Sequence, residues 1–236
     1  MFLREITYRE DKLPNFQEYP FNLPILNHAN FRLVFHKKVT FLVGENGTGK
    51  STILEAIALN CGFNPAGGSR NNMFGSVATE SPLANYLRLV WNQKINEGFF
   101  MRAETFFNFA SHLDQIGNYE AYGGKSLHQK SHGEAFLALF LHRFGDGIYI
   151  FDEPEAALSP QRQLAFLALL NQKLATHKCQ VIIATHSPIL LSYPDSFIYE
   201  LRDDELRKTA YKETEHYKIT KDFLDNPEAY QKHLFE

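Results

Sequence analysis

One eight-residue segment, GENGTGKS at residues 44–51, constrains the fold of this chain more than any other feature. It matches the pattern G-x-x-x-x-G-K-[ST] and lies between an apolar run at 39–43 and a helical pattern at 50–60. In such a strand–loop–helix the glycines let backbone N–H groups curl around a phosphate, and the start of the helix adds partial positive charge. A Gly-rich turn that precedes Lys-Ser by chance is the structural alternative, and the flanking strand and helix argue against it.

The chemistry of a phosphate loop assigns roles within this segment. Lys50 is expected to reach the β- and γ-phosphates and to act in catalysis, and the Ser51 hydroxyl is expected to ligate Mg²⁺. ATP and Mg²⁺ are therefore the predicted ligands. The residues predicted to contact ATP here are Asn46, Gly47, Thr48, Gly49, Lys50, Ser51 and Thr52.

A second apolar run, at 148–151, ends in two carboxylates, Asp152 and Glu153. We expect Asp152 to hold Mg²⁺, directly or through water. Glu153 is predicted to be catalytic, because a strand end that faces the phosphates brings a base within hydrogen-bond reach of the attacking water. The alternative is a strand that simply ends in solvated acids, and the phosphate loop in the same chain favours the functional role.

The segment SHGE at 131–134 opens a helical pattern and supports two readings. As a capping box, Ser131 caps the helix and Glu134 reaches back to it. As an anion site, Ser131, Gly133 and Glu134 bind the γ-phosphate that a second subunit holds, because a helix N-terminus attracts negative charge. The two readings are compatible, since an open helix end still needs a defined cap.

Two further segments follow the second apolar run. His186 comes directly after an apolar run at 181–185, where a histidine reaches the γ-phosphate and the water, so it is predicted to be catalytic. A purely structural histidine is the alternative. At 154–160, Ser159 and Pro160 form a good N-cap and first-turn pair for the next helix.

In this order, the segments resemble the Walker A, signature, Walker B, D-loop and switch-histidine motifs of the ABC ATPase superfamily, over about 39–191. GENGTGKSTILEAI, with Glu55 in the helix, resembles SMC and RecF-type ATPases. DEPEAAL and ATHSP are similar to the predicted-ATPase branch that includes the overcoming-lysogenisation-defect type. EYPFNLP at 18–24, SHGE and TEHY at 214–217 resemble phrases of small stand-alone bacterial predicted ATPases.

The resemblance implies an α/β P-loop NTPase of ABC ATPase type in one domain over 1–236. Its mostly parallel sheet is flanked by helices, with an N-terminal antiparallel portion and a helical insert at about 64–144. Strands are expected at 2–8, 31–35, 39–43, 98–102, 148–151, 181–185 and 197–201, and helices at 50–60, 81–97, 104–116, 132–144, 160–174 and 221–234.

The chain departs from the superfamily pattern at several positions. His132 replaces the first signature Gly, Glu134 the usual Gln and Ser159 the D-loop Asp. The Q-loop is left open among Gln93, Glu104 and Gln115, and the residue that stacks on adenine among Phe16, Tyr19 and Phe21.

Composition bears on location and partners. The formal net charge is −3 and the 2 cysteines form no CxxC pair. The longest apolar stretch, 135–141, is too short to span a bilayer. We therefore expect a cytoplasmic protein without direct membrane insertion. A modest basic patch from Arg70, Arg88 and Lys94 leaves nucleic acid open as a partner.

By resemblance, the function is Mg²⁺-dependent ATP hydrolysis that drives a head-to-tail homodimer switch. The resemblance also implies a separate soluble protein partner and a setting in DNA maintenance or defence against mobile elements. The alternative is the nucleotide-binding subunit of an ABC transporter, which Glu55 and the unclear Q-loop oppose. A third class binds ATP only structurally, and Glu153 argues against it.

Overall fold

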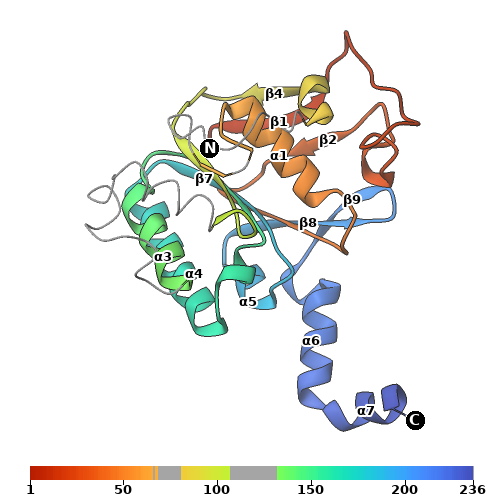
Figure 1. Cartoon of the computed structure of the whole chain (residues 1–236), viewed down its shortest axis with the longest axis vertical. Helices are drawn as coiled ribbons and strands as arrows, with labels where there is room; N and C mark the ends of the chain where they lie inside the picture. Colours follow the sequence, from red (N-terminus) through yellow and green to blue (C-terminus); the bar gives the residue numbers. More distant parts are fainter. Residues whose placement is uncertain (66, 69–80, 107–131, 236) are drawn as a thin grey trace.

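The computed structural model describes residues 1–65, 67–68, 81–106 and 132–235, and their strands form two sheets (Figure 1). The central sheet has the order β5-β6-β7-β3-β8-β9. Its strands are β3 (Val39–Val43), β5 (Gly98–Arg102), β6 (Gly147–Asp152), β7 (Cys179–Ala184), β8 (Ser196–Arg202) and β9 (Glu205–Thr209). All neighbouring pairs are parallel except β8 and β9. The predicted mostly parallel sheet is confirmed.

The central strands are apolar on both faces, as parallel strands covered on both sides require. In β3, Phe41 packs into one core and Leu42 into the other, and both are 0% exposed. The same alternation recurs in β6, where Ile150 and Phe151 point to opposite cores. This explains why these runs lack the polar alternation of a half-exposed strand.

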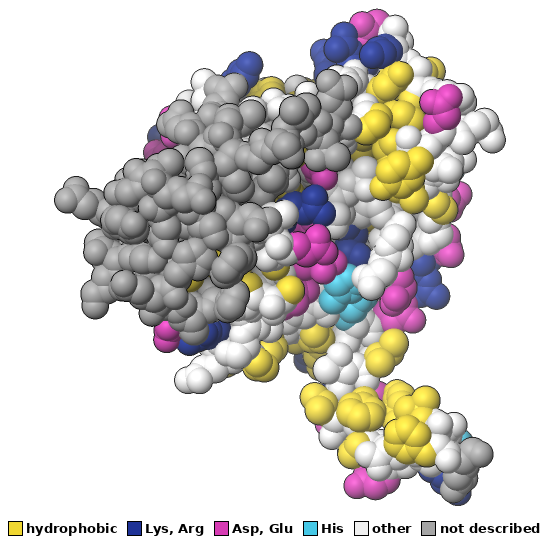
Figure 2. Space-filling model, viewed as in Figure 1, with side chains coloured by type: hydrophobic (Ala, Val, Ile, Leu, Met, Phe, Trp, Pro, Cys, Tyr) yellow, Lys and Arg dark blue, Asp and Glu magenta, His cyan; other side chains and the backbone are white. Residues whose placement is uncertain are grey.

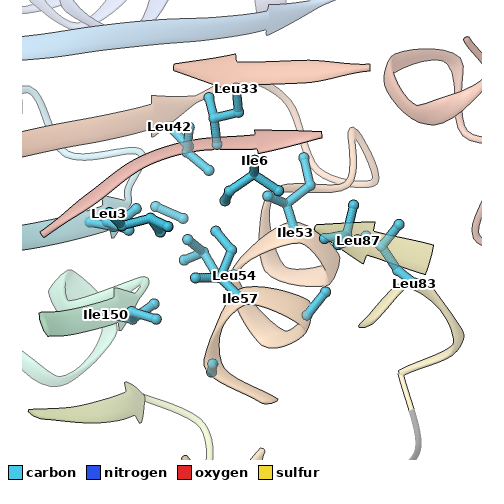
Figure 3. Close-up of a cluster of buried hydrophobic side chains, with 14 of the residues drawn as sticks. Leu3, Ile6, Leu33, Leu42, Ile53, Leu54, Ile57, Leu83, Leu87 and Ile150 are labelled. Atoms are coloured by element: carbon cyan, nitrogen blue, oxygen red, sulfur yellow. The ribbon is translucent and has the colours of Figure 1, made fainter. Parts of the chain in front are cut away.

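One face of the central sheet carries helix α1 (Lys50–Cys61), and a small antiparallel sheet covers that helix. The small sheet has the order β2-β1-β4, from β1 (Leu3–Tyr8), β2 (Arg32–Val34) and β4 (Leu87–Trp91). Figure 3 shows α1 side chains between the two sheets: Ile53, Leu54 and Ile57 of α1, with Leu3, Ile6 and Leu33 of the small sheet and Leu42 and Ile150 of the central sheet. The predicted N-terminal antiparallel portion is therefore confirmed.

The opposite face carries α3 (His132–Arg143), α4 (Pro160–Thr176) and α5 (Pro188–Leu191). Aromatic rings dominate this core. Phe140 lies 5.6 Å from Phe151 of the sheet and 4.8 Å from Phe166 of α4, between ring centroids. Short 3-10 helices occupy Pro24–Leu26 (η1), Pro82–Tyr86 (η2), Pro154–Ala157 (η5) and Tyr211–Glu213 (η6).

The chain ends in two helices, α6 (Glu215–Asp225) and α7 (Pro227–Phe235), which together we call the C-terminal arm. The arm extends away from both sheets (Figure 1). Figure 2 shows a yellow, apolar area over these helices. The exposed large apolar side chains of the arm are Ile219, Phe223, Leu224, Leu234 and Phe235. No helix in the described ranges has the length and apolar character needed to cross a membrane.

Some secondary-structure predictions were wrong. The predicted helix at 81–97 is the short η2 followed by strand β4, because β1 offers a hydrogen-bonding partner that lies far away in the sequence. The predicted C-terminal helix at 221–234 is two helices, because Pro227 lacks the N–H that a continuous helix needs. Strand β9 was not predicted. The predicted helix at 104–116 lies outside the described residues from 107 on, and so do Arg70 and Gln115.

Candidate functional site

The site forms where three neighbouring parallel strands end. The phosphate loop follows β3, Asp152 is the last residue of β6, and His186 follows β7. Because β6, β7 and β3 are adjacent and parallel, their carboxyl ends meet at one edge of the sheet. The topology therefore brings together the segments that hold Lys50, Ser51, Asp152, Glu153 and His186.

The phosphate loop depends on glycines at positions that other residues rarely occupy. Gly47 and Gly49 have φ values of 81° and 99°, in the left-handed region that favours glycine. A Cβ on Gly44 would lie 2.6 Å from the backbone oxygen of Leu201, so only glycine fits between the loop and β8. Gly49 is the N-cap of α1 and offers no capping side chain, which leaves the first N–H groups of the helix for an anion.

The Lys50 side chain lies beneath this loop and is buried, with 4% exposure. Its Nζ donates hydrogen bonds to the backbone oxygens of Gly44 at 2.7 Å and of Glu45 at 2.9 Å. Burial lowers the pKa of the ammonium, and the charges of Glu153 and Asp152 partly oppose this effect. The ammonium thus sits among carbonyl oxygens that a bound phosphate would replace.

Ser51 and Asp152 form an oxygen-rich pair. Ser51 Oγ donates to Asp152 Oδ1 at 3.0 Å. Burial raises the pKa of the Asp152 carboxyl to about 6, although the nearby Arg102 and the Ser51 hydrogen bond favour its charged form. A hydroxyl and a carboxylate at this spacing are the hard oxygen donors that Mg²⁺ prefers, so the residues fit the metal.

Arg102 is a site residue that the sequence analysis missed. It ends β5, in register with Asp152 of β6. Its Nε lies 3.4 Å from Asp152 Oδ2, and its Nη1 donates to Glu55 Oε2 of α1 at 3.1 Å. The one available signal was its position as the last residue of a predicted strand, at the edge where the other strands end. Glu55, noted above only as part of a resemblance, thereby gains a structural partner.

Glu153 has an uncommon backbone conformation, with φ 50° and ψ 53°. Its N–H donates to the backbone oxygen of Ala184 at 3.0 Å, which holds it against the end of β7. Its side chain is 38% exposed, and its Oε1 lies 3.4 Å from Nε2 of His186. The structure therefore places the predicted base and the predicted switch histidine side by side.

His186 is fixed from two directions. Its backbone N–H donates to Glu155 Oε1 at 2.6 Å, and its Nδ1 lies 2.8 Å from Nε2 of His216 in α6. Burial lowers the pKa of both imidazoles, and the positive charge of Lys50 lowers it further. His216 belongs to the TEHY phrase, to which the sequence analysis assigned no role.

The described part of the signature segment lies against the start of α4. A Cβ on Gly133 would lie 2.5 Å from Cδ of Arg162, and Arg162 Nη2 donates to Glu134 Oε1 at 3.0 Å. Ser131 lies outside the described residues. Ser159 occupies the N-cap of α4 as expected, but its side chain makes no capping hydrogen bond.

The three aromatic residues considered for stacking on adenine differ in their packing and exposure. Phe21 is 4% exposed and packs on Tyr86, and Phe16 packs edge-on against Tyr8, so both are packing residues. Tyr19 is 68% exposed, and its hydroxyl lies 3.5 Å from Thr52 Oγ1. It lines a pocket of about 260 Å³ with Leu23, Asn46, Gly47, Gly49, Lys50, Ser51, Thr52 and Glu153. Of the Q-loop candidates, Gln93 is an exposed residue after β4.

Several solved structures are similar to this chain. The SMC head domain from Thermotoga maritima is 15% identical, over 89% of this chain and 99% of that one, with a TM-score of 0.47. A part of the cbiONQ ABC transporter complex from Clostridium perfringens, cbiO1, is 20% identical over 84% and 88%, with a TM-score of 0.48. A dimeric bacterial ABC transporter cassette is 18% identical over 77% and 89%, with a TM-score of 0.44. No curated protein matches the chain.

Two family models match consecutive parts of the chain. The first, described as "AAA domain", matches residues 13–131, and the second, described as "AAA domain, putative AbiEii toxin, Type IV TA system", matches 134–192. The first match covers half of the 236 residues and includes the phosphate loop. The chain therefore belongs to the AAA-domain family of P-loop ATPases, as its phosphate-loop motif predicts.

Proposed function

We propose that this protein hydrolyses Mg²⁺–ATP and that two copies associate head to tail around two ATP molecules. One observation carries the proposal: the strand ends bring together a lysine, a serine–aspartate pair, a glutamate and a histidine. Ser51 Oγ and Asp152 Oδ1 are 3.0 Å apart, and Glu153 Oε1 and His186 Nε2 are 3.4 Å apart. This set contains a phosphate ligand, a metal-binding pair and a base for water.

Each side chain has a role in the proposed reaction. Lys50 exchanges its two carbonyl partners for β- and γ-phosphate oxygens of ATP. Ser51 and Asp152 hold Mg²⁺, which when bound neutralises phosphate charge. Glu153 orients and polarises the attacking water, whose oxygen bonds to the γ-phosphorus as the bond to ADP breaks. His186 contacts the γ-phosphate beside Glu153.

Other segments of the chain bind the adenine and supply the contacts from the second copy. Tyr19 is the proposed stacking residue for adenine, since it is exposed beside Thr52. In the partner copy, the signature residues Ser131, Gly133 and Glu134 complete the binding site for the γ-phosphate. Arg162, which lies over Gly133, adds positive charge at the start of α3. ATP then joins the two copies, and hydrolysis separates them.

Two substitutions test this function. Lys50→Ala should lose ATP binding, whereas Glu153→Gln should bind ATP and Mg²⁺ without turnover, because the shape is kept and the base is lost. Glu228→Gln on exposed α7 is the matched control and should hydrolyse ATP like the wild type. A Glu153→Gln protein with wild-type turnover would show that Glu153 is not the base.

Sedimentation tests the assembly. Glu153→Gln with ATP and Mg²⁺ should sediment as a dimer, because the closed state is no longer emptied by hydrolysis. The same protein remaining a monomer at tens of micromolar, with ATP shown to be bound, would contradict the dimer.

For the biological setting, we propose defence against mobile elements or DNA maintenance, with a separate soluble protein partner and nucleic acid as a second candidate. The description of the second matching family names a toxin of a type IV toxin–antitoxin system, which supports the defence setting. We also propose a cytoplasmic location, because the sequence has only 2 cysteines and no CxxC pair. Affinity purification of Glu153→Gln with and without ATP, together with DNA and RNA binding at physiological salt, tests this setting. An integral membrane permease as the main ATP-dependent partner would favour the transporter alternative.

A further inference from the structure

His216 lies in the first turn of α6 and contacts the candidate switch histidine. Its Nε2 lies 2.8 Å from Nδ1 of His186, and the ring centroids are 4.9 Å apart. The contact joins residues 30 apart in sequence. It also joins the C-terminal arm to the edge of the sheet where the ATP site lies.

The start of α6 is firmly held, so this contact is not the chance position of a surface side chain. Thr214 is 0% exposed and caps the helix, its Oγ1 accepting from the N–H of Tyr217. The ring of Tyr217 packs on Tyr211, with centroids 4.7 Å apart. The N–H of Glu215 donates to Glu200 Oε1 of β8 at 3.3 Å. The first turn of α6 is thereby attached to the central sheet.

The neighbouring carboxylate decides which nitrogen of His186 carries the proton. Two neutral imidazoles share one hydrogen in the 2.8 Å contact, so one ring donates and the other accepts. If His186 Nδ1 donated, its bare Nε2 would point a lone pair at Glu153 Oε1, 3.4 Å away. If His216 Nε2 donates, His186 carries its hydrogen on Nε2, facing the carboxylate. The second arrangement is favoured because it replaces a repulsion with an attraction.

We infer that His216 is a positioning residue that donates to Nδ1 of His186 and so holds His186 as an Nε2–H donor toward Glu153 and the γ-phosphate. The inference rests on the proposed function of His186. Nε2 of His186 is buried, and it lies 3.4 Å from Glu153 Oε1 without forming a hydrogen bond, so its N–H can still donate to a phosphate oxygen. An imidazole with the other tautomer would present a lone pair to the phosphate instead.

Three variants test the inference by ATP turnover. His216→Phe keeps a ring but removes the donor, and kcat should fall about tenfold or more while KM for ATP stays unchanged, because misplacing a catalytic group mainly slows the chemical step. His216→Gln keeps an N–H donor near the same position and should restore kcat to within about threefold of the wild type. His233→Phe, the same substitution on exposed α7, should leave kcat unchanged.

A double mutant separates positioning from general structure. If His216 acts through His186, then adding His216→Phe to His186→Ala should cause no further loss of kcat. Nitrogen NMR of the imidazoles should show the Nε2–H tautomer of His186 in the wild type and a mixture in His216→Phe. Melting temperatures identify any variant that fails to fold, and His216→Gln then carries the comparison.

Three results would overturn the inference: wild-type kcat in His216→Phe, an equal further loss in the His186→Ala background, or an Nδ1–H tautomer of His186 in the wild type. Failure of the proposed function looks different. In that case the wild type would show no Mg²⁺-dependent ATP turnover, or His186→Ala would hydrolyse ATP at the wild-type rate. The NMR measurement would still decide whether His216 donates to His186.

Discussion

Glu153 has the left-handed backbone conformation, φ 50° and ψ 53°, that a side chain with a Cβ seldom adopts. Such a conformation costs about 1–2 kcal/mol for a residue other than glycine. The hydrogen bond from its N–H to Ala184 maintains the conformation at the end of β7. The proposed catalytic base is thus positioned at the expense of stability, a combination found at many functional sites.

A pair of substitutions at this position separates strain from catalysis. Both Glu153→Gly and Glu153→Gln remove the carboxylate, so both should abolish ATP turnover. Only glycine relieves the strain, and after its greater unfolded-state entropy is subtracted, Glu153→Gly should be about 0.5–1 kcal/mol more stable than Glu153→Gln. Urea unfolding of the two proteins measures the difference. Equal free energies of unfolding would mean that the conformation at Glu153 stores no strain.

At the scale of elements, the guanidinium of Arg102 links three secondary-structure elements, β5, α1 and β6. Arg102 of β5 contacts Glu55 of α1 and Asp152 of β6, at 3.1 and 3.4 Å. The side chains of Arg102 and Asp152 are 24% and 5% exposed, so this charge network is largely withdrawn from solvent. Removing Arg102 takes the ion-pair partner from both of these carboxylates, which is costly in such an environment.

Arg102→Met should therefore lower the free energy of unfolding by about 2 kcal/mol. Arg32→Met is the matched control and should lower the free energy of unfolding less, because Arg32 is 61% exposed in its pair with Glu5. Mg²⁺ with ATP should raise the melting temperature of Arg102→Met more than that of the wild type, because Asp152 then lacks its neighbouring cation. An equal rise in both proteins would contradict the view that arginine and metal share this carboxylate.

Gln180 links the two sheets through its side-chain amide. The side chain is 0% exposed, its Oε1 accepts from the N–H groups of Phe2 and Leu3 at 2.8 Å each, and its Nε2 donates to the backbone oxygen of Leu3 at 2.9 Å. Gln180→Leu leaves these buried backbone groups unpaired, so the free energy of unfolding should fall by about 3 kcal/mol. Gln172→Leu, at an exposed position of α4, is the control and should change stability by less than about 0.5 kcal/mol in the same denaturation assay.

The sequence predicted those elements whose determinants are local. The strands β3 and β5 were predicted at their observed bounds, and so was the start of α1 at Lys50. Strand β4 was missed because its partner, β1, is about eighty residues away, and no local pattern reports a distant sheet edge. Strand β9 follows a two-residue turn, Asp203–Asp204, in which Asp203 has φ 57°. The sequence signal for this turn was the pair of aspartates, which was not used in the prediction.

The same division applies to the site. Lys50, Ser51 and Asp152 lie in contiguous motifs, and the structure brings their segments together. Arg102 and His216 were missed because their roles arise only from contacts with Asp152 and His186, across neighbouring strands or from a distant helix. Contiguous motifs can be recognised in a sequence. Residues that contact a motif from a distant segment can be identified only when the fold is known.

At the scale of the whole molecule, the proposed active site is composite, which a mixing experiment tests. Lys50→Ala spoils the phosphate loop but keeps the signature segment, and Gly133→Asp does the reverse. Each protein alone should be inactive. Mixed in equal amounts, half of the dimers contain both variants, and each of these holds one complete site, so about a quarter of the wild-type activity should return. ATP turnover against mixing ratio measures this, and an inactive mixture of two folded proteins would contradict the head-to-tail arrangement.

The C-terminal arm has a consequence that follows from thermodynamic reciprocity. Its exposed apolar side chains lie beyond the turn of α6 that carries His216, and His216 contacts His186 at the ATP site. If closing the site around ATP changes the affinity of the arm for a binding partner by some factor, then that partner must change the affinity for ATP by the same factor. A partner that binds the arm would then regulate the ATP site without touching the nucleotide. It would set the ATP concentration at which the site closes.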